Sequence, residues 1–126
     1  MLLLVGLGGG LGAVARYMMG HAVFRVWPMT FPLGTLLINV IGAVLMGLFA
    51  GIVSQRSGPE AESLRHFVAV GLLGGFTTFS TFSLETIALI ERGALAQAGG
   101  YVLLSVVVCL IGLYLGLLVT RGISVA

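Results

Sequence analysis

The chain has 126 residues, of which 59% are hydrophobic and 8% charged, whereas a soluble domain of this size has about 25% charged residues. This composition excludes a water-soluble globular domain and favours a protein whose main solvent is lipid. The charges are six arginines and four glutamates, and the resulting net charge of +2 gives no indication of nucleic-acid binding.

Four apolar stretches predict one all-α membrane domain with four transmembrane helices. They run approximately over residues 2–24, 31–54, 67–90 and 97–120. Each stretch reaches the ~20 residues that cross a bilayer as a helix. The short polar connectors contain the helix breakers Pro28 and Gly58-Pro59, and the even number of spans places both termini on one side. The first stretch lacks a basic leading segment, which favours a spanning helix over a signal peptide.

The first span combines small residues with a deep arginine. Gly8, Gly12, Arg16 and Gly20 recur every four residues, and small residues at this spacing are typical of close helix packing. An arginine at this depth costs at least ~2.5–3.5 kcal/mol unless it is paired, hydrated or snorkelling. Arg16 therefore either snorkels toward the helix end or anchors an interface or a water-filled vestibule.

The second span carries one amide, Asn39, about a third of the way along its length. An amide exposed to lipid is costly, so this side chain is expected to face protein or water. It either makes an interhelical hydrogen bond or donates its NH2 group to a permeating anion. Gly47 and Gly51 form a further pair of small residues that favours helix packing.

The third span contains the segment GGFTTFSTFS, Gly74–Ser83, which predicts a break in the helix. Glycines and β-branched threonines lower helix propensity, and threonine hydroxyls compete for backbone carbonyls. A break frees backbone groups that lipid cannot satisfy, so it must be buried in protein or line a cavity or an ion site. Freed carbonyl oxygens suit hard cations such as Na+.

Aromatic and hydroxyl side chains crowd the same segment. Phe76, Phe79 and Phe82 are three residues apart, which predicts one shared helical face. That face either packs against a neighbour or presents its electropositive ring edges to a small anion. The hydroxyl donors beside these rings are Ser80, Thr81 and Ser83.

The end of the third span and the fourth span add further polar groups. Glu85 must be paired, protonated or close to water at its depth. Tyr101, Ser105 and Cys109 are four residues apart, which predicts either a polar track or separate interhelical hydrogen bonds. Cys109 is the single cysteine, so the chain forms no internal disulfide.

The arginines outside the spans give almost no orientation signal. Arg56, Arg65 and Arg121 belong to the side of the termini, and Arg25 and Arg92 belong to the other side. The positive-inside rule needs a larger asymmetry, so the chain is expected to insert in both orientations. Two oppositely inserted copies could then pair about a two-fold axis in the membrane plane.

Three segments, in this order, are similar to the Fluc (CrcB) family of fluoride channels: GGLGAVARY (Gly9–Tyr17), GTLLINVIGAVLMG (Gly34–Gly47) and GGFTTFSTFS (Gly74–Ser83). The resemblance covers nearly the whole chain. It implies a fluoride-selective passive channel that exports cytoplasmic fluoride across the bacterial inner membrane and reduces fluoride toxicity. It also implies an antiparallel, dual-topology homodimer with two pores, no enzymatic activity and no organic cofactor.

The resemblance also implies roles for particular residues. A structural Na+ at the centre of the dimer would be bound by the backbone carbonyls of Gly74 and Thr77. Arg16 would belong to a vestibule. Cys109 occupies a position where the resemblance leads us to expect serine, and a thiol is a weaker donor than a hydroxyl. The fluoride pore would be lined by Asn39, Phe79, Phe82, Ser80, Thr81, Tyr101, Ser105 and Glu85.

The main alternative is a small dual-topology multidrug/proton antiporter. Such a transporter needs a membrane-embedded acid in its first span, but here that span carries Arg16, and the intramembrane acid is Glu85 in the third span. A non-transporting scaffold would leave the phenylalanines and hydroxyls without a function. An enzyme is disfavoured because the sequence has no catalytic or metal-ligand cluster, and His21 and His66 lie near span ends.

Overall fold

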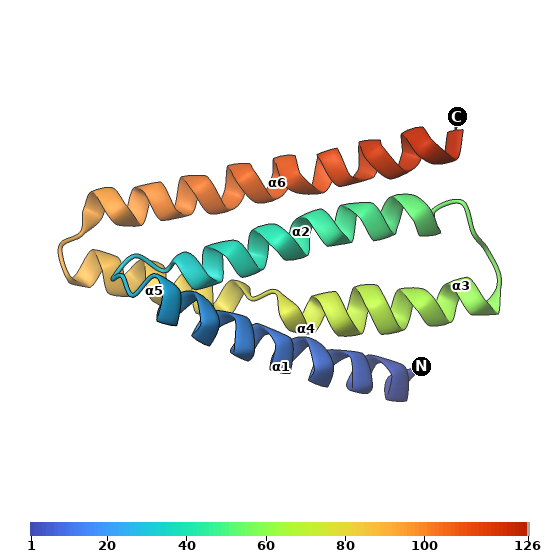
Figure 1. The fold of residues 1–126 in the computed structure, drawn as a ribbon, viewed down its shortest axis with the longest axis horizontal. Coiled ribbons are helices and arrows are strands. Elements are labelled where there is room, and N and C mark those ends of the chain that lie inside the picture. Colours follow the sequence, from blue (N-terminus) through green and yellow to red (C-terminus); the bar gives the residue numbers. More distant parts are fainter. Residues whose placement is uncertain (126) are drawn as a thin grey trace.

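Four long helical spans run alternately between the two ends of the molecule (Figure 1). The computed structural model describes the backbone of residues 1–125 and the side chains of residues 1–121. The continuous spans are α1 (Leu2–Val26), α2 (Leu33–Val53) and α6 (Leu95–Val125). The third span consists of α3 (Pro59–Leu64), the π-helical η1 (Arg65–Leu73), α4 (Gly74–Phe76) and α5 (Phe79–Glu91). All four spans are long and apolar enough to cross a membrane, and both chain ends lie at the same end of the bundle.

The third span begins at Pro59, earlier than the Phe67 start that the sequence predicts. Pro59 stands in the first turn, where its missing N–H costs no helical hydrogen bond. Gly58 precedes it with a φ of 100°, a backbone conformation that glycine adopts without strain. Glu60 and Glu62 complement the helix dipole in the first turn. The glycine–proline pair therefore ends the connector and starts a helix.

Arg65 ties the connection between α2 and the third span together. Its guanidinium donates to the carbonyl of Val53 at 3.2 Å, to the carbonyl of Arg56 at 3.0 Å and to the Glu62 carboxylate at 2.9 Å. Val53 is the last residue of α2, and its carbonyl also accepts the Arg56 N–H at 2.9 Å, so the arginine adds a second hydrogen bond at this helix end. These hydrogen bonds hold the connector between α2 and α3 at the end of the bundle.

Glycines let α2 and α6 approach closely. A Cβ atom at Gly47 would meet the backbone carbonyl of Leu113, and one at Gly116 would lie 2.7 Å from the Val44 carbonyl oxygen. A Cβ at Gly51 would meet the Thr120 side chain. These contacts confirm that Gly47 and Gly51 serve helix packing, as their spacing predicts.

Glycines also join α1 to the third span. The backbone of η1 and α4 lies so close to Gly8 and Gly12 that side chains at either position would collide with it. A Cβ at Gly75 would in turn lie 2.5 Å from the Gly9 carbonyl oxygen. The small-residue face predicted in the first span therefore packs against η1 and α4 of the third span.

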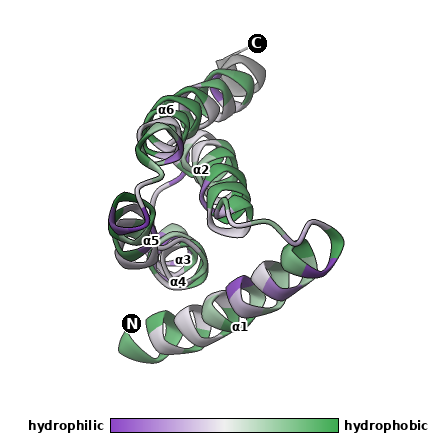
Figure 2. Cartoon of the chain, turned by 90° about the vertical axis from the view of Figure 1, so that its left-hand side faces the viewer, coloured by the Kyte–Doolittle hydropathy of each residue, from purple (hydrophilic) through white to green (hydrophobic). Residues whose placement is uncertain are grey.

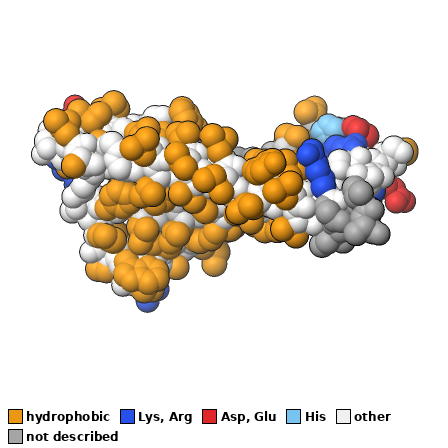
Figure 3. All heavy atoms as spheres, turned by 90° about the horizontal axis from the view of Figure 1, so that it is seen from above, with side chains coloured by type: hydrophobic (Ala, Val, Ile, Leu, Met, Phe, Trp, Pro, Cys, Tyr) orange, Lys and Arg blue, Asp and Glu red, His pale blue; other side chains and the backbone are white. Residues whose placement is uncertain are grey.

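The outer surface is mostly apolar, as a lipid-facing protein requires. Figure 2 shows apolar residues most continuously along α2 and α6, and Figure 3 shows apolar side chains covering the middle of the molecule. Charged side chains gather at the end that carries the connection between α2 and α3. The best-buried core lies at the opposite end, where Leu89, Ala98 and Tyr101 pack under the turn between α5 and α6.

Candidate functional site

The helix break lies at Thr77 and Thr78. Thr77 has φ −82° and ψ 159°, and Thr78 has φ −151° and ψ 120°, so both residues are extended between two helices. Thr77 donates its hydroxyl to the Leu73 carbonyl at 3.0 Å, which holds the end of α4. The Thr78 hydroxyl accepts the Thr81 N–H at 3.2 Å and so caps the start of α5. The threonines themselves therefore end one helix and begin the next.

The break is one of the features that the sequence predicts, but its position differs in detail. Gly74 and Gly75 remain helical because Gly75 packs directly against the backbone of α1 at Gly9. The extended residues also separate Phe76 from the phenylalanines of α5. The prediction that Phe76 shares a helical face with Phe79 and Phe82 is therefore wrong, since a three-residue spacing aligns side chains only within one helix.

Asn39 pairs with the backbone of the break. Its Nδ2 donates to the Thr78 carbonyl at 3.0 Å, and its Oδ1 accepts the Thr78 N–H at 2.8 Å. The sequence left open whether this amide makes an interhelical hydrogen bond or meets an anion, and the structure shows the hydrogen bond. An asparagine amide carries two N–H bonds, and one of them is used in this pair.

Arg16 reaches the other side of the break. Its Nε donates to the Gly75 carbonyl at 3.2 Å, near the end of α4, and its side chain is half-buried. The guanidinium therefore satisfies a carbonyl that the end of the helix leaves unpaired. Of the two roles that the sequence allows, this contact supports the anchoring role.

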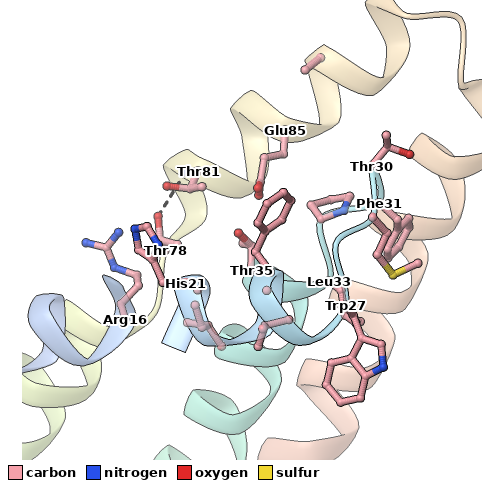
Figure 4. A pocket seen from close by; sticks show the side chains of 18 of the residues that line it. Arg16, His21, Trp27, Thr30, Phe31, Leu33, Thr35, Thr78, Thr81 and Glu85 are labelled. Atoms are coloured by element: carbon pink, nitrogen blue, oxygen red, sulfur yellow. Dashed lines mark hydrogen bonds between the residues drawn. The ribbon is translucent and has the colours of Figure 1, made fainter. Parts of the chain in front are cut away.

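Arg16 also lines a cavity of about 500 Å³, which we call the vestibule (Figure 4). The vestibule opens at the end of α1 and α2 opposite the chain termini, and Figure 4 shows the labelled side chains around it. Its polar lining residues include Arg16, His21, Thr35, Thr78, Thr81, Glu85 and Arg92. The vestibule therefore extends from the connection between α1 and α2 to the helix break.

A second space of about 430 Å³ lies on the far side of Thr78, and we call it the groove. Asn39 and Thr78 line it beside the break, α5 contributes Phe79 and Phe82, and α6 contributes Ser105. Thr78 lines both spaces, whereas Asn39 lines only the groove.

The phenylalanines of α5 form a short aromatic row. The ring centroids of Phe79 and Phe82 are 5.5 Å apart, and those of Phe82 and Tyr101 are 5.0 Å apart. Phe31 meets Tyr101 edge-on at 5.5 Å. Phe79 remains 78% exposed, so the row runs from the core to the surface of this single chain.

Glu85 has a defined partner, Tyr101. The fully buried Tyr101 donates its hydroxyl to a Glu85 carboxylate oxygen at 3.0 Å, which links α5 to α6. Ser105 lies one turn further along α6, and its buried Oγ has no hydrogen-bond partner among the described residues. The polar line that the sequence predicts on the fourth span therefore faces α5 and the groove.

The other hydroxyls that the sequence predicts beside the phenylalanines are only partly free to bind an anion. Ser80 Oγ lies 3.4 Å from Thr78 Oγ1, and Thr81 lines the vestibule. Ser83 donates to the carbonyl of Phe79 at 2.9 Å, within its own helix. Sequence reasoning missed Thr78, which the structure places at the centre of the site. The doubled threonine after two glycines is the signal that could have identified it.

Together these features define an all-helical, multi-pass membrane protein whose third span breaks beside two open spaces, the vestibule and the groove. The family model of CrcB-like proteins, Camphor Resistance (CrcB), matches residues 3–117. The chain belongs to the CrcB family.

Curated relatives match nearly the whole chain. A protein of Caulobacter sp. (strain K31) named "Fluoride-specific ion channel FluC" is 46% identical over 122 residues, which covers 97% of this chain and 95% of that protein. "Fluoride-specific ion channel FluC 2" of Nitrobacter hamburgensis is 48% identical and covers 97% and 98% of the two chains. The FluC protein of Phenylobacterium zucineum is also 48% identical.

Proposed function

We propose that this protein is a fluoride-selective passive ion channel that exports cytoplasmic fluoride and so reduces its toxicity. The names of the relatives support this function, and their similarity extends over the full length of the site. The observation in the structure that carries the proposal is the groove. It is a mostly apolar space at a break in a membrane span, and its wall combines phenyl rings with the Ser105 hydroxyl, which has no hydrogen-bond partner among the described residues.

The chemistry of the groove suits a small, strongly hydrated anion. Conduction requires the pore to replace the water shell of the ion without holding the ion too tightly. Ser105 offers a neutral hydroxyl donor, and Phe79 and Phe82 offer electropositive ring edges. Arg16 and Arg92 line the vestibule and not the groove, and their positive charge there favours the entry of anions.

In this proposal two oppositely inserted copies form a homodimer around a structural Na+. Gly74 and Thr77 would hold the cation through their backbone carbonyls, because oxygen donors suit this hard ion. Their surroundings fit that role. Gly74 is exposed in the single chain, Thr77 has an extended backbone at the end of α4, and Arg16 occupies the neighbouring carbonyl of Gly75. The bound cation would supply a shared centre for the two chains.

Release of fluoride and chloride from liposomes tests the proposed function. The purified chain should release fluoride quickly and chloride no faster than protein-free vesicles do, as ion-selective electrodes would record. Equal release of both anions would contradict the proposal.

A pair of matched variants connects the activity to the groove. Phe82→Ile keeps much of the apolar volume but removes the ring edge, and it should slow fluoride release at least about tenfold. Phe49→Ile makes the same replacement on α2, at a residue that lines neither the vestibule nor the groove. Equal rates in the two variants would show that the ring of Phe82 serves only packing.

A further inference from the structure

The groove contains two sulfur atoms that the proposed anion path does not use. Met46 of α2 and Cys109 of α6 both line it, and both side chains are half-buried rather than enclosed in the core. Soft sulfur donors of this kind select soft metal ions such as Cu+ over hard ions such as Na+. Their presence in one open space is the starting point of the inference.

A second feature of the same wall also points to a ligand. Ser105 is one helical turn before Cys109, only 7% of it is exposed, and its Oγ has no hydrogen-bond partner among the described residues. It lines the groove together with the two sulfur residues. A buried polar atom without a partner is costly unless something in the adjoining space meets it.

The helices that carry the two sulfur residues form a firm frame. Around the groove, α2 and α6 are in backbone contact, since a Cβ at Gly116 would lie 2.7 Å from the Val44 carbonyl oxygen and 2.8 Å from the Leu48 nitrogen. The methionine side chain, in contrast, has three rotatable bonds and adapts to what it contacts. Cys109 can therefore act as the fixed donor and Met46 as the movable one.

We infer that the groove is a binding site for a soft, thiophilic monovalent cation, with Cys109 Sγ as its anchoring ligand and Met46 Sδ as its second donor. On binding, the thiol S–H bond breaks, its proton passes to water, and a sulfur–metal bond forms without any change of oxidation state. Two donors suffice for Ag+ or Cu+, which accept linear two-coordination.

Occupation of the site should block the proposed anion path. The bound metal would sit beside Phe82 and Ser105 and fill space in the groove through which the anion is proposed to pass. Because the thiol loses its proton on binding, the block comes from this loss of space and not from added charge. This consequence rests on the proposed function, whereas the binding of the cation does not.

Silver ion is a suitable probe for both statements. Silver fluoride is soluble, so nitrate salts without chloride allow silver and fluoride to be used together. Binding is measured as protection of Cys109 from N-ethylmaleimide, read by intact mass, because Cys109 is the single cysteine. Block is measured as the rate of fluoride release with silver, divided by the rate of the same variant without silver.

Silver should protect Cys109 and slow fluoride release at least about tenfold, and Cys109→Ser should remove the inhibition. Met46→Leu should raise the silver concentration needed for half-protection about tenfold or more. Met18→Leu, on the exposed surface of α1, is the matched control and should leave that concentration unchanged.

Three results would overturn the site: no protection of Cys109, equal inhibition of Cys109→Ser, or an unchanged half-protection concentration in Met46→Leu. The result also separates the two proposals. If the unmodified protein releases no fluoride, the proposed function fails, while protection of Cys109 still decides whether the metal site exists.

Discussion

At the helix break, Asn39 replaces the hydrogen bonds that a continuous helix would have made. Thr78 lies outside the helices on either side, so its N–H and carbonyl would be unpaired at membrane depth. The Asn39 amide meets both groups, at 2.8 and 3.0 Å. Unpaired backbone groups in lipid each cost several kcal/mol by order of magnitude, so one side chain makes the break tolerable.

Replacement of Asn39 by aspartate tests this pairing. The carboxylate can still accept the Thr78 N–H but cannot donate to the Thr78 carbonyl, and its charge repels an anion in the groove. We expect Asn39→Asp to slow fluoride release from liposomes at least about tenfold.

Ser54→Ala is the control for this variant, because it removes a polar group that bonds only to Gly51 of its own helix. It should release fluoride at the unaltered rate. A normal rate in Asn39→Asp would show that the donor side of the pair is dispensable.

The hydroxyl of Tyr101 donates to the side chain of Glu85 at 3.0 Å. A typical hydrogen bond contributes about 0.5–1.5 kcal/mol, and Glu85 is only half-buried beside the vestibule, so Tyr101→Phe should destabilise the protein by about that amount. Tyr114→Phe removes the same atom from a side chain that is 58% exposed, and it should leave stability unchanged. Unfolding in mixed micelles of increasing denaturing detergent compares the two variants.

The pair of Tyr101 and Glu85 can also be isolated by a double-mutant cycle. Once Glu85→Gln has replaced the carboxyl group, Tyr101→Phe should cost less than it does alone, because the two changes act on one contact. Strictly additive losses would mean that the two side chains do not depend on each other.

At the scale of the elements, the break in the third span shows how far the sequence could be interpreted. Glycines and threonines predict a break, and the structure has one within the predicted segment. Its residues could not be fixed from local propensity, because Gly75 is held in α4 by the backbone of α1, far away in the sequence. Likewise, the polar character of Asn39 predicts a protein-facing position, but its partner depends on how α2 meets the third span.

The contact between α2 and α6 should be sensitive to a single methyl group. In Gly47→Ala the new Cβ would meet the backbone carbonyl of Leu113, which cannot rotate away as a side chain could, so the two helices must separate. Such overpacking costs about 1–3 kcal/mol. Detergent-induced unfolding should therefore shift to milder conditions.

Gly10→Ala supplies the matched control for Gly47→Ala. Nothing lies within 4 Å of a Cβ at Gly10, so this change should leave stability unchanged or raise it by about 0.5–1 kcal/mol, since alanine is the better helix former. If both variants unfold alike, the close approach of α2 and α6 does not limit stability.

The whole molecule has an apolar belt between two charged ends (Figure 3). The end with the chain termini carries Arg56, Arg65 and Arg121, and the opposite end carries Arg25 and Arg92. Arg65 is also bound to two backbone carbonyls, so part of its charge is engaged in holding the connector. The difference between the two ends is too small to fix one orientation by the positive-inside rule.

We therefore expect about half of the copies to insert in each orientation, because neither end dominates. A Cys109→Ser background with one new cysteine, Ser57→Cys in the connector between α2 and α3, allows this to be measured. An impermeant thiol reagent added outside intact vesicles should label about half of the copies, and rupture of the vesicles should expose the rest. Thr30→Cys marks the opposite end of the bundle. It should also be labelled in about half of the copies, because the end that faces outward in one orientation faces inward in the other. If one of the two sites were fully labelled and the other fully protected, the chain would have a single orientation. An antiparallel pair could then not form.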